Sequence, residues 1–169
     1  MRHYQHTWSF TVKVTHWLVA FGVLFNMFND TGYTHRSIGY ICVALVLIRI
    51  VHGWQKNGLA RSRFYFPSWS LVKQHVKSIL EGKITQHEGH NPLGMWAVYI
   101  MWVLIALLAF TGWLSRTDAF WGEDGPVILH QALSNTLLTI VLIHVAAVFV
   151  MSKLEKRNLI KQMIFSRRR

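Results

Sequence analysis

The chain has 169 residues, which is enough for one domain and too few for two large ones. Hydrophobic residues make up 52% of it, yet its formal net charge is +11, so the basic residues either form a nucleic-acid-binding face or lie in loops beside a membrane. The single cysteine, Cys42, excludes disulfide frameworks, thiolate zinc sites, iron–sulfur clusters and covalent c-type haem attachment.

Four long apolar segments predict four transmembrane helices. They span about residues 10–28, 34–54, 92–114 and 127–151, and each is close to the ~20 residues that a helix needs to cross about 30 Å of hydrocarbon. The third and fourth contain no Asp, Glu, Lys or Arg, so they have no water-facing stripe for a soluble bundle. We therefore expect an all-α, integral membrane four-helix bundle that forms a single domain over residues 1–169, with a first helix that is retained and not cleaved as a signal peptide.

Charged residues in the connections predict the orientation of the bundle. One side carries most of the basic residues: Arg2, Lys13, Lys56, Arg61, Arg63, Lys73, Lys77, Lys83, Lys153, Lys156, Arg157, Lys161, Arg167, Arg168 and Arg169. The short connections on the other side carry Arg36, Arg116, Asp30, Asp118, Glu123 and Asp124. Because Lys and Arg accumulate on the cytoplasmic side, we expect both termini in the cytoplasm. Topology thus explains the basic excess, and since no basic–aromatic recognition motif remains, no nucleic-acid partner is expected.

The long cytoplasmic connection, residues 55–91, contains one periodic stretch between Ser68 and Glu81. Apolar residues recur there at helical spacing, with lysines between them: Trp69, Val72, Lys73, Val76, Lys77, Ile79 and Leu80. This pattern favours a short amphipathic helix that lies on the inner membrane surface. A partly ordered loop is the alternative.

The fourth apolar segment carries two histidines at different depths. His130 lies near its outer start and His144 in its inner half, 14 residues later. On a helix this spacing leaves the two roughly 40° apart around the axis and about 21 Å apart along it. One metal ion cannot bind both, because its ligands must converge within a few ångströms. A haem takes one imidazole from each side of its ring, usually from different helices, so two depths on one helix predict two haems stacked across the bilayer.

Two further histidines match these depths. His35 lies at the outer start of the second segment, like His130, and His16 lies near the inner entry of the first, like His144. We therefore pair His35 with His130 around an outer haem, and His16 with His144 around an inner haem. Each histidine alone could instead form a hydrogen bond to a neighbouring helix, but four that match in two pairs by depth favour ligation of haem iron.

Gly39 and Arg49 fit the same arrangement. Gly39 follows His35 by four residues on the same face, where a small residue lets a macrocycle or another helix approach closely. Arg49 lies 14 residues after His35, toward the inner side. An intramembrane cation needs an anion, and a propionate of the inner haem is a candidate. Snorkelling of Arg49 to the inner headgroups is the alternative.

The other histidines have less specific surroundings. Polar segments, where we expect solvated side chains, hold His3, His6, His75 and His87. His52 ends the second apolar segment and His90 directly precedes the third, and either could help form an inner quinone or proton site. Pro92 near a helix start is a purely structural explanation of the segment around His90.

These motifs resemble those of the bacterial cytochrome b561 and nickel-hydrogenase b-type cytochrome family. They are Thr15-His16-Trp17, His35 with Gly39 and Arg49, Gly89-His90-Asn91-Pro92-Leu93-Gly94, and His130-Gln131-Ala132-Leu133-Ser134-Asn135 with His144. The resemblance covers nearly the whole chain, from about Val12 to the basic tail. The paired histidines of the last helix are its most specific part.

The resemblance implies a diheme b-type cytochrome in the bacterial inner membrane that exchanges electrons between quinone and a partner, as in a respiratory chain. It implies that the partner is a periplasmic c-type cytochrome or a hydrogenase-like oxidoreductase subunit. The predicted segments include no extra helix or redox domain of the kind found in larger relatives, so the sequence does not indicate which of these partners applies. Assembly with further copies or other subunits also stays open.

Two other functions compete with this interpretation. A self-contained superoxide:quinone oxidoreductase (a superoxide oxidase) would use Arg36 and Arg116 to attract superoxide, although the nearby Asp118, Glu123 and Asp124 would repel it. A small transporter or assembly factor would hold no haem. Superoxide oxidation ranks second because of these acids.

Overall fold

The computed structural model of the chain describes residues 8–54, 65–83 and 90–164. Over these residues it is built from helices, in the order α1 (Phe10–Phe28), α2 (Gly32–Trp54), α3 (Trp69–Leu80), α4 (Pro92–Leu114), the short 3-10 helix η2 (Asp118–Phe120), α5 (Asp124–Leu154) and α6 (Leu159–Ile164). Four of them, α1, α2, α4 and α5, are long and apolar enough to cross a membrane. The expected all-α membrane bundle is thereby confirmed.

The observed helix bounds follow the predicted segments closely, with the largest difference in α5. This helix has 31 residues and extends three residues beyond the expected segment at each end. Pro126 is tolerated in its first turn because backbone N–H groups there have no intrahelical partner. At 1.5 Å per residue α5 is about 46 Å long, so its ends extend beyond ~30 Å of hydrocarbon.

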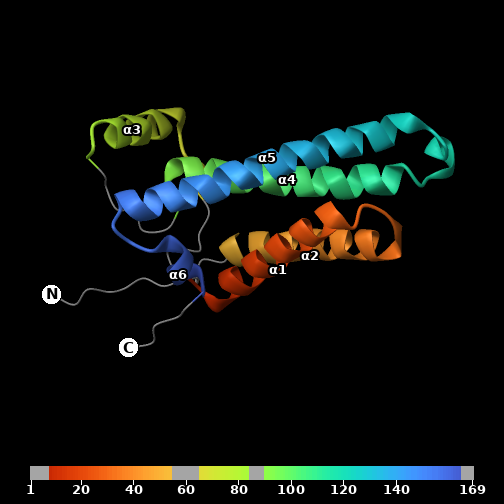
Figure 1. The fold of residues 1–169 in the computed structure, drawn as a ribbon, viewed down its shortest axis with the longest axis horizontal. Coiled ribbons are helices and arrows are strands. Elements are labelled where there is room, and N and C mark those ends of the chain that lie inside the picture. The colour runs from red at the N-terminus through yellow and green to blue at the C-terminus, as the bar shows by residue number, and fades with distance from the viewer. Residues whose placement is uncertain (1–7, 55–64, 84–89, 165–169) are drawn as a thin grey trace.

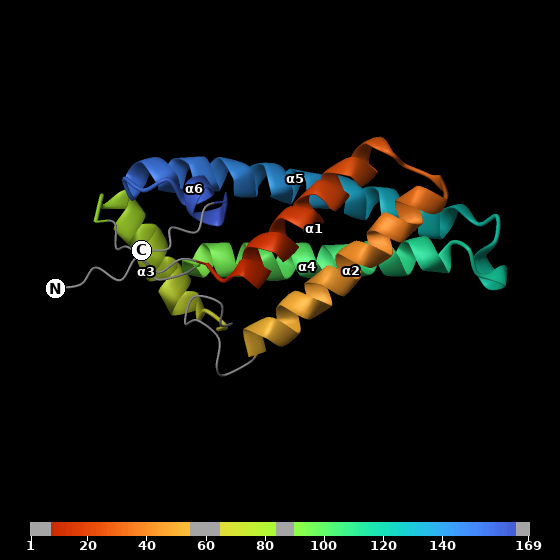
Figure 2. The same cartoon turned by 90° about the horizontal axis from the view of Figure 1, so that it is seen from below.

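The four spans form two antiparallel hairpins, α1 with α2 and α4 with α5 (Figure 1). The first hairpin crosses the second obliquely, with α2 next to α4 (Figure 2). Gly22 allows α1 to approach α2 closely, because a Cβ atom there would lie 2.6 Å from the Cys42 Sγ atom. A side chain at this position would therefore push the first hairpin apart.

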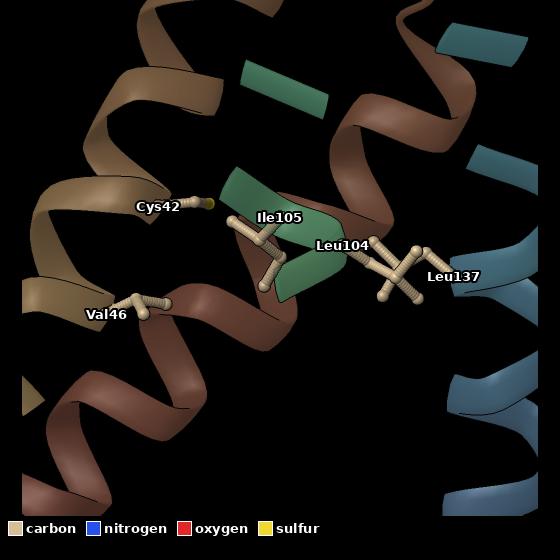
Figure 3. Packing of buried hydrophobic residues seen from close by; sticks show 5 residues of the cluster. All are labelled: Cys42, Val46, Leu104, Ile105 and Leu137. Carbon is tan, nitrogen blue, oxygen red and sulfur yellow. The ribbon is translucent and has the colours of Figure 1, made fainter. Parts of the chain in front are cut away.

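A small apolar core joins the two hairpins. Its buried residues come from α2, α4 and α5 and are Cys42, Val46, Leu104, Ile105 and Leu137 (Figure 3). Large apolar side chains elsewhere on the spans are exposed, for example Phe21 at 65% and Ile143 at 63%. An exposed apolar surface of this extent suits contact with lipid.

The two ends of the bundle differ in their connections. We call the end where α1 and α4 begin and α2 and α5 end the terminal end, and the opposite one the loop end. Short connections close the loop end, whereas α3 and α6 lie at the terminal end (Figure 1). The indole Nε1–H of Trp17 on α1 donates to the carbonyl of Met163 on α6, at 3.3 Å. The sequence analysis did not predict α6.

The amphipathic helix expected between Ser68 and Glu81 is present as α3. The Ser68 hydroxyl caps its start by accepting a hydrogen bond from the backbone N–H of Leu71, at 3.4 Å. The expectation of a solvated His75 is wrong, because this side chain shares the packed face of α3 with Val72 and is 5% exposed. The other three histidines expected to be solvated, His3, His6 and His87, lie outside the described residues.

Candidate cofactor site between the helices

The structure brings His35 and His130 together at the loop end. His35 lies in the first turn of α2 and His130 in the second turn of α5. Their ring centroids are 5.9 Å apart and their planes are inclined by 61°. Because metal–imidazole bonds are about 2 Å long, two imidazoles on opposite sides of one iron have centroids on the order of 6 Å apart. The observed separation fits such a pair.

The hydrogen bond of His35 leaves one particular ring nitrogen free. Its Nδ1 lies 2.6 Å from the carbonyl oxygen of Asn29, which follows α1. A carbonyl only accepts, so Nδ1 carries the proton and Nε2 has the lone pair. Asn26 fixes the backbone at the same place, since its amide donates to the His35 carbonyl at 2.9 Å. His35 is thus oriented as an Nε2 ligand.

His130 is oriented in the same way by a different partner. Its Nδ1 lies 3.0 Å from the hydroxyl oxygen of Thr111, a residue of α4 that is 2% exposed. The Thr111 hydroxyl donates its proton to the backbone carbonyl of Leu107, at 2.9 Å. Its oxygen therefore accepts from His130 Nδ1, and the Nε2 lone pair of His130 is available. Such outer partners are typical of imidazoles that bind a metal.

A cavity of about 90 Å³ lies between α1, α2, α4 and α5 at this pair. The lining includes both histidines together with Asn26, Arg36, Gly39 and Ser134. Arg36 is partly buried and makes no hydrogen bond or ion pair with any residue that the structure describes. Gly39 contributes no side chain to the α2 wall of the cavity, and a Cβ atom there would make an ordinary contact, 3.8 Å from the Asn26 amide nitrogen.

Gly112 is the position at which α4 comes close to the His130 ring. A Cβ atom added there would lie 3.4 Å from Cε1 of His130. The absence of a side chain thus leaves room for the His130 ring against α4, where Thr111 holds its Nδ1 atom.

His16 and His144 lie with two other residues at the terminal end. His90 lies near Arg49, His144 and His16, and burial followed by these three groups lowers the pKa of His90 well below its usual value. Arg49 is 7% exposed on α2. The Nδ1 atom of His16 is buried and has no hydrogen-bond partner within the described ranges. The residues expected at the inner depth therefore share one cluster, which also includes His90.

His90 and His52 contact the start of α1 and the segment before α3. The His90 ring lies 4.7 Å from the Trp8 ring, centroid to centroid, and its carbonyl accepts a hydrogen bond from the Tyr65 hydroxyl at 3.0 Å. The Nε2 atom of His52 lies 3.1 Å from the hydroxyl of Ser9, which caps α1. His52 thus joins the end of α2 to the start of α1, while His90 belongs to the terminal-end cluster.

Thr111 is the site residue that sequence reasoning missed. It is the one aliphatic hydroxyl in the otherwise apolar α4 sequence, and this signal was available. Its partner His130 is 19 residues away, so its role depends on how α4 packs against α5.

The two histidine positions suit haem better than a bare metal ion. No group of three or more His, Cys, Asp or Glu side chains within the described ranges could hold a metal ion. Two facing imidazoles are sufficient when a macrocycle supplies the remaining ligands. The available Nε2 atoms of the two histidines and the unpaired Arg36 thus fit a haem with anionic propionates at the loop end.

Comparison with known proteins agrees with this chemistry. The family model described as prokaryotic cytochrome b561 matches residues 7–166. No curated protein and no solved structure matches the chain. The chain therefore belongs to the prokaryotic cytochrome b561 family and is a multi-pass membrane b-type cytochrome that takes part in electron transfer.

Proposed function

We propose that the chain is a diheme cytochrome that transfers electrons across the bacterial inner membrane, between the quinone pool and a periplasmic redox partner. His35 and His130 ligate the haem at the loop end, and His16 and His144 ligate the haem at the terminal end. The observation that carries this proposal is the loop-end pair, with rings 5.9 Å apart and each Nδ1 engaged elsewhere. The terminal-end cluster supports the second position.

Protein groups ligate the haem iron, orient the ligating imidazoles and neutralise the haem propionates. Asn29 and Thr111 hold the two loop-end imidazoles in the tautomer that presents Nε2, which also raises their basicity. Arg36 at the loop end and Arg49 at the terminal end are the cations that pair with propionates, and Gly39 gives the macrocycle room against α2. Bound haem iron supplies one-electron redox chemistry. Two axial imidazoles leave no open position on iron, so we do not expect oxygen binding.

We propose that the terminal end faces the cytoplasm. Among the described residues, this end carries Lys73, Lys77, Lys83, Lys153, Lys156, Arg157 and Lys161, in agreement with the positive-inside rule. A reporter that is active only in the cytoplasm should therefore give a signal when it is fused after Arg169, and a reporter that is active only in the periplasm should not. A periplasmic signal from that fusion would reverse the assignment. His90, half-buried near His16 and Arg49, makes this end the better candidate for the quinone site.

The partner at the loop end is proposed to be a basic c-type cytochrome or an oxidoreductase subunit with a basic docking face. Asp118, Glu123 and Asp124 are exposed, and none pairs with a basic side chain of a described residue. Asp124 begins α5 and precedes His130 by six residues, about 9 Å along the axis. Free acids this close to a haem ligand would steer a basic partner toward the haem.

Superoxide oxidation is the second candidate, and the position of Arg36 favours it. An unpaired cation on the wall of the loop-end cavity is suited to attract a small anion. Arg116 contributes less, because its guanidinium lies over the Trp121 ring, 5.7 Å from the centroid. Purified protein mixed with superoxide and ubiquinone separates the candidates, since only a superoxide oxidase reduces the quinone without another protein.

The haem complement tests the proposal. The protein as purified should contain two b haems per chain by pyridine haemochrome, and denaturation should release both because no cysteine pair tethers them. Haem that stays attached after denaturation would contradict non-covalent ligation. A colourless protein would contradict the electron-transfer function itself.

A further inference from the structure

Helix α3 starts at a defined depth beside α4. The hydroxyl of Tyr99 on α4 donates to the Tyr65 carbonyl at 2.9 Å, and the Trp96 indole donates to the Pro67 carbonyl at 3.3 Å. The Phe66 ring also stacks on Tyr99, with centroids 5.0 Å apart. Tyr99 lies seven residues into α4, about 10 Å from its start. The segment before α3 is therefore attached to the membrane-spanning part of α4 and not only to its end.

This depth lies on the acyl-chain side of the boundary between lipid headgroups and acyl chains, a few ångströms inside it. The 23 residues of α4 are about 35 Å long, slightly more than ~30 Å of hydrocarbon, so its first turn lies among headgroups. Trp and Tyr side chains concentrate at this boundary, as Trp96 and Tyr99 do here. Figures 1 and 2 place α3 outside the four-helix bundle at the terminal end.

The side chains around α3 fall into four arcs, and the order of these arcs indicates what surrounds the helix. At about 100° per residue, a packed arc is followed by an exposed apolar arc, a lysine arc and a polar arc. The packed arc holds Val72, His75 and Ile79, and the exposed apolar arc holds Trp69, Val76 and Leu80. The lysine arc holds Lys73 and Lys77, and the polar arc holds Ser70, Gln74 and Ser78. Leu71, which is 44% exposed, lies between the polar arc and the packed arc. This order suits a helix that lies beside a bundle at a bilayer surface. Around such a helix the packed arc meets protein, the apolar arc meets acyl chains, the lysine arc meets phosphates and the polar arc meets water.

The exposed apolar arc is not covered by another part of the described chain. Trp69 is 68% exposed, Val76 39% and Leu80 82%. These three side chains, the two lysines and Val72 line a shallow groove that is formed by side chains of α3 alone. The chain thus presents an apolar groove with a cationic rim at headgroup depth.

The cationic rim keeps positive charge available. Lys73 is exposed and makes no hydrogen bond or ion pair with a described residue. Lys77 lies 3.7 Å from Glu81, but this acid also pairs with Lys83 at 3.1 Å, so the two ion pairs leave a net positive charge. An anionic headgroup would complement this charge, whereas a zwitterionic one would not.

We infer that the groove of α3 is a binding site for acidic phospholipid. Acyl chains cover the Trp69–Val76–Leu80 arc, and the lipid phosphate contacts Lys73 and Lys77. The lipid would hold α3 and its preceding segment against α4, and Tyr65 of that segment donates to the carbonyl of His90 in the terminal-end cluster. The site does not depend on how many haems the chain holds.

The first test measures which arc faces lipid. Nitroxide labels at Val76→Cys and, as the matched control on the same helix, Gln74→Cys are compared in nanodiscs of the full-length protein. Cys42 is 3% exposed and does not take up label. We expect the label at 76 to be more accessible to oxygen, and the label at 74 more accessible to a water-soluble nickel complex. The reverse result would overturn the site.

The second test measures selectivity for headgroup charge. Native mass spectrometry of the holoprotein counts retained phosphatidylglycerol and phosphatidylcholine. Lys73→Gln/Lys77→Gln should lower the preference for phosphatidylglycerol about fivefold per lysine, whereas the control Lys156→Gln/Lys161→Gln removes the same charge at the same end and should retain it. No preference in the wild type, or an equal loss in both double variants, would overturn the site.

Discussion

The two histidine pairs differ in how completely the described protein orients them. At the loop end both imidazoles have an outer partner, the Asn29 carbonyl for His35 and the Thr111 hydroxyl for His130. At the terminal end the Nδ1 atom of His16 is buried without a hydrogen-bond partner in the described part of the chain. Hydrogen bonds thus orient both histidines at the loop end, whereas no described residue orients the Nδ1 atom of His16.

The surroundings of the pairs differ as well. The terminal-end pair shares its space with Arg49 and His90, whereas the loop-end pair lies near three exposed acids and one unpaired arginine. Positive charge near a haem favours its reduced form. We therefore expect two distinguishable midpoint potentials, with the terminal-end haem the more easily reduced.

Removal of a ligand should have the largest effect. His35→Ala and His130→Ala should each lose the same haem, and His16→Ala and His144→Ala should each lose the other, because an iron with one axial imidazole is held weakly. Reduced-minus-oxidised spectra of the four purified variants measure this loss. His52→Ala is the matched control, since its ring bonds to Ser9, and it should keep both haems. Matching spectra for the His35 and His144 variants would break the pairing by depth.

Loss of an outer partner should have the next largest effect and should act at the loop end alone. Thr111→Val keeps the shape of the side chain but leaves His130 Nδ1 without its acceptor. Outer partners of this kind typically contribute 10–100-fold to metal affinity, so haem titration should show loop-end affinity lower by about tenfold or more. Thr111→Ser retains the hydroxyl and should bind normally. Equal affinities for the valine and serine variants would show that this hydrogen bond does not orient the ligand.

The two arginines should tune one haem each. Arg36→Gln should lower the midpoint potential of the loop-end haem, and Arg49→Gln that of the terminal-end haem, because each removes a positive charge that favours the reduced iron. We expect about a tenfold change in the reduction equilibrium, which is 59 mV for a one-electron couple. Potentiometric titration of both variants measures it. A shift of both haems by either variant would contradict the assignment of one arginine to each end.

Neutralisation of the loop-end acids should have the smallest effect, on rate alone. The triple variant Asp118→Asn/Glu123→Gln/Asp124→Asn should exchange electrons with a basic c-type cytochrome several-fold more slowly at low salt, with unchanged haem spectra. Stopped-flow traces should show that rising ionic strength slows electron exchange by the wild type more than electron exchange by the variant. Asp30→Asn, on the other loop-end connection, is the control. Identical traces for the triple variant and the wild type at every salt concentration would exclude the acids as the docking site.

The sequence predicted the fold and the depths of the histidines for a clear physical reason. Uncharged runs such as 92–114 must lie in lipid, and the 14-residue spacing of His130 and His144 places them at two depths whatever the neighbouring helices do. The closeness of His35 and His130 in the structure agrees with the pairing by depth. Whether these histidines ligate haem iron remains the proposal that the variants test.

What the sequence did not predict depends on packing between helices. The partnership of Thr111 with His130 requires the observed contact of α4 with α5. The attachment of Tyr65 and Pro67 to α4, which sets the depth of α3, also joins residues about 30 positions apart. His75 is expected in solvent because it lies in a largely polar segment, yet the packing of α3 buries it. Local composition does not determine any of these contacts.

The central claim is that one chain holds two haems, one at each end of the bundle. A pyridine haemochrome assay on the purified wild-type protein, normalised to protein by amino-acid analysis, tests it most directly. The account predicts 2 b haems per chain, and potentiometric titration of the same sample should resolve two components of equal amplitude. One haem per chain with a single component would contradict it.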